Sequence, residues 1–239
     1  MAKTTRSRSR AARLGALVCA LALGQGCASA LPAGVAWNYF ATPHGDDPWM
    51  RKIGQWQERE RWKRSDAAEP AQAAVAGASE IPSAAARPSG DLRSEYDAFR
   101  AAQRRTFARD LATWIQWKAQ DHYIPDGPVD HWATLAETLD GNGDDCDGLE
   151  LLVYNLLREF GFAEDEVYRA IVVLPSDGQH HMVTLWFEGR SDPWVIDPTG
   201  AMTTGMPRMS EVPGWQPLKV FSGTERFTVE RLPVAQPAR

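Results

Sequence analysis

The sequence has little cysteine, with three among its 239 residues. Cys19 and Cys27 lie within the first thirty residues, so the remainder of the chain keeps only Cys146. A lone cysteine cannot form an intrachain disulfide, which excludes a small disulfide-stapled fold. Its neighbours, "GDDCDG", are too polar for a cysteine that serves only as a small buried apolar side chain. The pattern therefore favours a chemical role for Cys146.

Long apolar runs are also missing. The run from Leu14 to Gly24 is too short to span a bilayer. The basic residues before it are Lys3, Arg6, Arg8, Arg10 and Arg13, and no acidic residue accompanies them. This pattern predicts a signal peptide over residues 1–30 and an exported protein of the periplasm or cell envelope. Cleavage after Ala30 fits, and so does lipoprotein processing, in which a lipid on Cys27 would be the link to a membrane.

Basic side chains are outnumbered. The full chain has 26 Lys and Arg against 31 Asp and Glu, and the predicted signal removes five basic residues and no acidic one. The remaining 21 basic and 31 acidic side chains give a net charge of −10. This balance argues against nucleic acid or an anionic membrane surface as the main partner. A protein or peptide substrate in the cell envelope is the expected partner.

The order of sequence patterns predicts how the chain is organised. Residues 31–65 are rich in tryptophan, with a helix expected near Pro48–Arg64. Residues 66–90 consist mainly of Ala, Pro and Ser and are expected to be a linker, because they cannot bury enough apolar area to fold. Residues 91–232 are expected to form the globular domain.

Within that domain, helical spacing comes first and period-two spacing follows. Helices are expected at about 91–120, 132–139 and 146–160, and strands at 167–174, 181–188, 194–200, 218–223 and 226–232. Leu149, Val153, Leu157 and Phe160 are expected to face inward from the third helix, and Gly161 to end it. This order predicts an α+β fold, with N-terminal helices packed on an antiparallel β-sheet.

Cys146 begins the third predicted helix, where unpaired N–H groups and the helix dipole stabilise a thiolate and an oxyanion. A nucleophilic cysteine also needs a base, and the base needs a group that orients it. If the two strands around Gly189 form a hairpin, paired residue numbers sum to about 378 and His181 faces Asp197. A slip of one residue would bring His180 instead, from the opposite face. The pattern predicts a Cys146–His181–Asp197 triad.

These motifs carry a family resemblance. "GDDCDGLELL", "HHMVTLWFE" and "WVIDPTG" resemble the Cys, His and Asp motifs of the transglutaminase-like, papain-related superfamily. "DHWATLAETLDGNGDDCDG" resembles the bacterial transglutaminase-like cysteine proteinases, whose members include periplasmic proteases that clip surface adhesins. The resemblance covers residues 91–200 or so.

The resemblance implies a transglutaminase-like, papain-like core with Cys146 as nucleophile, His181 as base and Asp197 as orienting group. It also implies a calcium site at Asp145 and Asp147, although the chemistry itself requires no cofactor. After the cysteine, the family usually has Glu and then Asp, whereas this chain has Asp147 and then Gly148.

A second interpretation of the acidic stretch is an EF-hand, because Asp140, Asn142 and Asp144 alternate as in its calcium loop. However, Asp145 stands where that loop needs Gly, and Leu151 where it needs its closing Glu. The acids could also simply cap the helix.

The expected function is that of an exported cysteine peptidase that cleaves amide bonds of an envelope or surface protein. Two alternatives stay open. The same triad could pass the acyl group to an amine, as a transglutaminase does. The chain could also be a catalytically silent binding module that docks through its tryptophan-rich segment.

Overall fold

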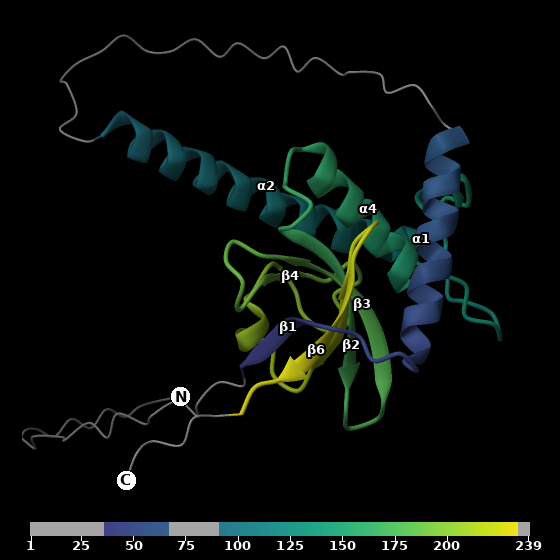
Figure 1. The fold of residues 1–239 in the computed structure, drawn as a ribbon. Helices are drawn as coiled ribbons and strands as arrows, with labels where there is room; N and C mark the ends of the chain where they lie inside the picture. The colour runs from purple at the N-terminus through teal and green to yellow at the C-terminus, as the bar shows by residue number, and fades with distance from the viewer. Residues whose placement is uncertain (1–35, 67–90, 234–239) are drawn as a thin grey trace, which may run out of the picture. The chain divides into compact units, whose positions relative to one another are not determined.

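The computed structural model describes residues 36–66 and 91–233. The predicted signal over 1–30 and nearly all of the predicted linker over 66–90 lie outside these residues. The described elements are β1 (Trp37–Ala41), α1 (Pro48–Asp66), α2 (Leu92–His122), α3 (Leu135–Asp140), α4 (Cys146–Glu159), β2 (Val167–Leu174), β3 (Gln179–Trp186), β4 (Trp194–Ile196), η1 (Met209–Glu211), β5 (Gln216–Phe221) and β6 (Arg226–Arg231) (Figure 1). Among them, none of the helices combines the length and apolarity that a bilayer crossing requires.

The strands form one antiparallel sheet in the order β1-β6-β5-β2-β3-β4. Helix α4 packs between α2 and the sheet (Figure 1). Its buried Leu149, Val153 and Leu157 meet Ile115 of α2 and Trp186 of β3. The α+β fold class is confirmed, and the helices precede the other strands as the sequence predicts, but β1 comes before the helices and was not predicted.

Helix α4 begins and ends as its sequence indicates. The Asp145 side chain caps the first turn, and Gly161 adopts a φ of 82° just after the last turn, a conformation that favours glycine. The expectation for Phe160 is wrong, because its ring is 61% exposed at the C-cap position. Leu151 is fully buried instead, since α1 covers a second side of α4.

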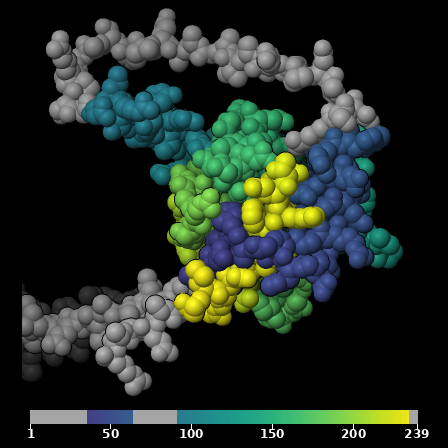
Figure 2. Space-filling model, in the orientation of Figure 1, coloured from purple at the N-terminus to yellow at the C-terminus, as the bar shows by residue number. Residues whose placement is uncertain are grey.

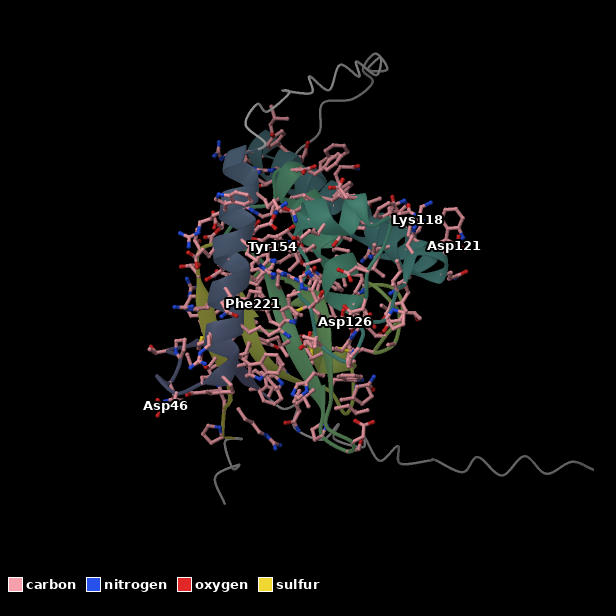
Figure 3. The ribbon with its side chains drawn as sticks, turned by 90° about the vertical axis from the view of Figure 1, so that its right-hand side faces the viewer. Asp46, Lys118, Asp121, Asp126, Tyr154 and Phe221 are labelled. Atoms are coloured by element: carbon pink, nitrogen blue, oxygen red, sulfur yellow. The ribbon has the colours of Figure 1, made fainter. Side chains whose placement is uncertain are left out.

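The tryptophan-rich N-terminal segment packs into the same unit as the rest of the described chain. Strand β1 pairs with β6, and Figure 2 shows the two side by side at the surface. In α1, Ile53 and Trp56 are fully buried, and the Trp56 ring lies 5.7 Å from that of Phe221 in β5. Figure 3 labels Phe221 beside α1. The helix predicted near Pro48–Arg64 is confirmed, but its place in the core depends on partners far along the chain.

Candidate active site

Cys146 is the first residue of α4, and the loop before it is fixed to the end of α2. Asp144 N donates to His122 O (3.1 Å), and Ile124 N donates to Asp144 O (3.0 Å). The Asp145 side chain then accepts a hydrogen bond from Asp147 N (3.0 Å). Because this cap takes the N–H of Asp147, the N–H of Cys146 is the first-turn donor next to the thiol that has no acceptor within the helix and is available to a developing negative charge.

The Cys146 thiol faces the start of β3. Strand β3 pairs with β4 over Thr184–Trp186, which leaves the earlier residues of β3 beyond that pairing. There, the backbone N–H of Met182 acts to lower the pKa of the thiol, although burial outweighs it. Cys146 and His181, the residue before Met182 in β3, line the same cavities.

His181 and Asp197 are in direct contact. His181 Nε2 lies 2.8 Å from Asp197 Oδ1, and both side chains are buried. An ionised carboxylate only accepts hydrogen bonds, so Nε2 carries the hydrogen and Nδ1 is left to exchange a proton. The ring of Trp215 lies 6.0 Å from the imidazole. This arrangement gives the imidazole both the orientation and the tautomer that a general base needs.

The register that brings this pair together differs by two residues from the expected one. The observed pairs Thr184–Ile196, Leu185–Val195 and Trp186–Trp194 each sum to 380, not to about 378. Asp197 lies one residue beyond β4 and meets His181 diagonally. A shift of two keeps every side chain on its face of the sheet, which explains why His181 is still the residue that meets Asp197.

Asp197 is held by backbone donors. Oδ1 accepts from Thr199 N and Gly200 N, both at 3.0 Å, and Oδ2 accepts from Met202 N (2.6 Å) and Thr203 N (2.9 Å). Burial alone would raise the pKa of Asp197. The hydrogen bond and charge of His181, with the Thr203 and Met202 N–H groups, outweigh burial and lower this pKa.

Negative charge next to Cys146 has the opposite effect and raises pKa values. Burial, and then the charge of Asp145, raise the pKa of the Cys146 thiol to about 12. Burial and Asp145 also raise the pKa of Asp147 to about 9, against the opposing charge of Arg169. Asp147 is 4% exposed, and its Oδ1 atom is buried without a hydrogen-bond partner. A positive charge placed here would lower both pKa values.

Two cavities meet at Cys146, and both are lined by Cys146, His180, His181 and Asp145. One measures about 960 Å³ and continues along Trp117, Gln120 and Thr199. The other measures about 310 Å³ and lies between Cys146 and Trp49 of α1. A chain that passes over Cys146 would therefore be in reach of both cavities.

Comparison with solved structures finds LapG of Legionella pneumophila, in calcium-bound and EGTA-treated forms. The calcium-bound form has a TM-score of 0.44 and 19% identity, and covers 59% of this chain and 81% of its own. The EGTA-treated form has the same TM-score and 16% identity, and the match covers 74% of this chain and 84% of the LapG chain. A proposed cysteine protease from Cytophaga hutchinsonii matches with a TM-score of 0.30 and 12% identity, over 57% of this chain and 53% of its own.

No family model and no curated protein sequence matches this chain. Similarities this low do not assign an activity, so the functional conclusion depends on the geometry of the site. That geometry brings Cys146, His181 and Asp197 together, while their catalytic roles stay predictions. In the part of the chain that the structure describes, no three or more His, Cys, Asp or Glu side chains are grouped so as to hold a metal ion.

Two residues of the site were not found from the sequence. Arg169 of β2 and Glu150 of α4 are fully buried and paired, and Thr184 Oγ1 donates to Glu150 Oε1 (2.5 Å). Arg169 Nη2 also donates to the backbone oxygen of Asp147 (2.8 Å), which fixes the first turn of α4. The available signal was a single charged residue inside the apolar strand "VYRAIVVL".

Gln116 of α2 was missed as well. Its Nε2 donates to Asp197 O (3.0 Å) and Thr203 O (3.2 Å), so it ties the loop after β4 to the helix layer. Nothing in the local sequence marks this glutamine, because its partners are some eighty residues away in the chain.

Proposed function

We propose that this protein is an exported cysteine peptidase that cleaves amide bonds of an envelope or surface protein. Cys146 is the nucleophile, His181 the general base and acid, and Asp197 the group that orients His181. The observation that supports this best is the buried His181–Asp197 hydrogen bond at the cavity that Cys146 lines. Export follows from the signal over residues 1–30, and a lipid on Cys27 would keep the enzyme at a membrane.

The proposed reaction has two halves. Cys146 Sγ attacks the carbonyl carbon of the substrate while its proton moves to Nδ1 of His181, and the backbone N–H of Cys146 faces the oxyanion. The carbon–nitrogen bond then breaks, and His181 returns the proton to the leaving amine. Water, deprotonated by His181, attacks the resulting thioester and releases the acid together with the Cys146 thiol.

The negative charge of the acidic residues around Cys146 suits the binding of a cation. Asp147 has a buried, unpartnered carboxylate oxygen, and burial, followed by the charge of Asp145, raises its pKa. We propose that Asp145 and Asp147 hold calcium, with the further oxygen ligands that calcium needs coming from backbone carbonyls, Asp144 or water. When bound, calcium would supply positive charge beside the thiol.

Alkylation of Cys146 tests the triad directly. With calcium added to offset the charge of the aspartates, iodoacetamide should modify Cys146 much faster than a free thiol, and His181→Ala should slow this reaction. His180→Ala is the matched control, because it removes the neighbouring imidazole that does not contact Asp197. Equal rates in all three proteins would contradict the proposed nucleophile–base pair and favour a silent binding module.

Incubation with envelope fractions identifies the reaction. The wild-type protein should release fragments of an envelope protein, and Cys146→Ala should release none. A parallel reaction with a labelled primary amine separates hydrolysis from acyl transfer. Incorporation of the amine without cleavage of the chain would replace the peptidase by the transglutaminase alternative.

Calcium is tested without relying on activity. Adding calcium after EGTA treatment should raise the melting temperature of the wild-type protein and not that of an Asp147→Asn variant. If neither EGTA nor calcium changes the melting temperature, the two aspartates only cap α4.

A further inference from the structure

The smaller cavity beside Cys146 combines aromatic walls with acidic groups. Trp49, Trp132, Ile171 and Met182 supply apolar lining, while Asp126, Asp130, Asp145 and Asp147 supply carboxylates. No lysine or arginine is among the described residues that line it. We propose that this cavity is a subsite that binds a cationic side chain of the substrate, a lysine or an arginine, next to the bond that is cleaved. This inference rests on the proposed peptidase function and adds a substrate preference to it.

The tryptophan wall is built by the N-terminal segment. Trp49 lies in the first turn of α1, and its backbone N–H donates to Asp47 Oδ1 (3.0 Å). Asp47 in turn pairs with the ammonium group of Lys219 in β5, which fixes the start of α1 to the sheet. The Trp49 ring then lies 6.1 Å from that of Trp132 and 5.1 Å from that of His180. This gives the tryptophan-rich segment a direct role at the active site.

The carboxylates give the cavity its charge preference. The Oδ1 atom of Asp147 is buried without a partner, so one acidic group of the lining has an unmet need for a donor or a cation. Asp126, near the middle of the view in Figure 3, comes from the loop before α3. Four carboxylates carry up to −4, the ion pair of Lys52 with Asp130 offsets one of these charges, and a single divalent cation on Asp145 and Asp147 would still leave −1. The cavity therefore favours a cationic side chain with or without calcium.

A lysine of the chain itself already binds to an indole and a carboxylate beside this cavity. Lys52 Nζ pairs with Asp130 and lies 4.5 Å from the centroid of the Trp132 ring. An ammonium group held between an indole and a carboxylate is thus compatible with this part of the surface. With a volume of about 310 Å³, the cavity is suited to one long side chain, while the larger cavity across Cys146 takes the rest of the peptide.

Charged thiol reagents test the cavity without a substrate. Cationic ethylammonium and anionic ethylsulfonate methanethiosulfonates differ mainly in charge, and mass spectrometry of the Cys146 peptide reports each rate in the full-length protein. The ratio of the cationic to the anionic rate constant is divided by the same ratio measured with 2-mercaptoethanol. This normalised ratio should be about ten, a modest value for electrostatic steering. An Asp126→Asn/Asp130→Asn variant should bring this ratio most of the way to one, in calcium and in EGTA alike. A normalised ratio of one in the wild-type protein would overturn the proposal.

Peptides test the preference itself. Internally quenched peptides carrying lysine, norleucine or glutamate at each position near the centre are compared, since norleucine retains the apolar stem and lacks the charge. At one position lysine should exceed norleucine by about tenfold in kcat/KM, and glutamate should be poorest. Trp49→Leu should reduce cleavage of both the lysine and norleucine peptides. The control Trp62→Leu, on the same helix but outside this cavity, should leave both unchanged.

The two experiments separate failure of the subsite from failure of the proposed enzyme. If no peptide is cleaved and the reagent ratio is high, the peptidase function is wrong and the acidic cavity stands as a site that binds cations. If peptides are cleaved with no preference for lysine or arginine over norleucine, the subsite is wrong and the peptidase stands.

Discussion

Replacing Asp197 by Asn tests how the carboxylate orients His181. Asp197 accepts two backbone N–H groups at Oδ2 and two more, besides His181, at Oδ1. An asparagine amide can place its NH2 group at either oxygen position, and in both orientations this group faces at least two backbone N–H donors. Losing two charge-assisted hydrogen bonds at about 1.5 kcal/mol each gives a cost of about 3 kcal/mol in the free energy of unfolding.

The same change should remove most activity, because the amide no longer selects the tautomer in which Nδ1 accepts the proton. A loss on the order of 10³–10⁴ in kcat is expected for a wrong-tautomer variant. Urea unfolding gives the stability, and turnover of a cleaved peptide gives kcat at a temperature where the variant is folded. Asp197→Ala is the control, since it leaves the donors unpaired without opposing them. An asparagine variant as stable and as active as the wild type would refute this account of the loop after β4.

Three further predictions concern the same region. His181→Ala should reduce turnover by several orders of magnitude, as expected for a triad member. His180→Ala should chiefly raise KM, because it removes the contact of His180 with Trp49. The reverse outcome would place the base at His180. Arg169→Met should cost about 3–5 kcal/mol in urea unfolding because it leaves the buried Glu150 unpaired, and adding Glu150→Gln should recover part of that loss. The folded pKa of Asp197 lies below its unfolded value, so its stabilising contribution should be complete above about pH 4 and lost as pH falls through the folded pKa. Urea unfolding between about pH 2 and 5 would measure this loss. The Asp197→Asn variant should lack this pH dependence.

Local patterns predicted most of the elements and the members of the candidate site. The strand over Val167–Leu174 and the start of α4 at Cys146 lie where period and capping place them. His181 could be chosen over His180 because alternation along a strand survives the two-residue error in the hairpin register. Such features depend on neighbours a few residues apart, which the sequence displays directly.

What only the tertiary structure decided are the contacts between distant segments. Burial of Arg169 against Glu150, anchoring of the Asp197 loop by Gln116, and the position of Trp49 beside Cys146 each join elements that no local period connects. The tryptophan-rich segment has the pattern of a helix whether or not it packs on the domain. Its role at the site follows from β1 pairing with β6 and from Trp56 packing on Phe221, because burial of apolar area depends on the partner surface and not on the segment alone.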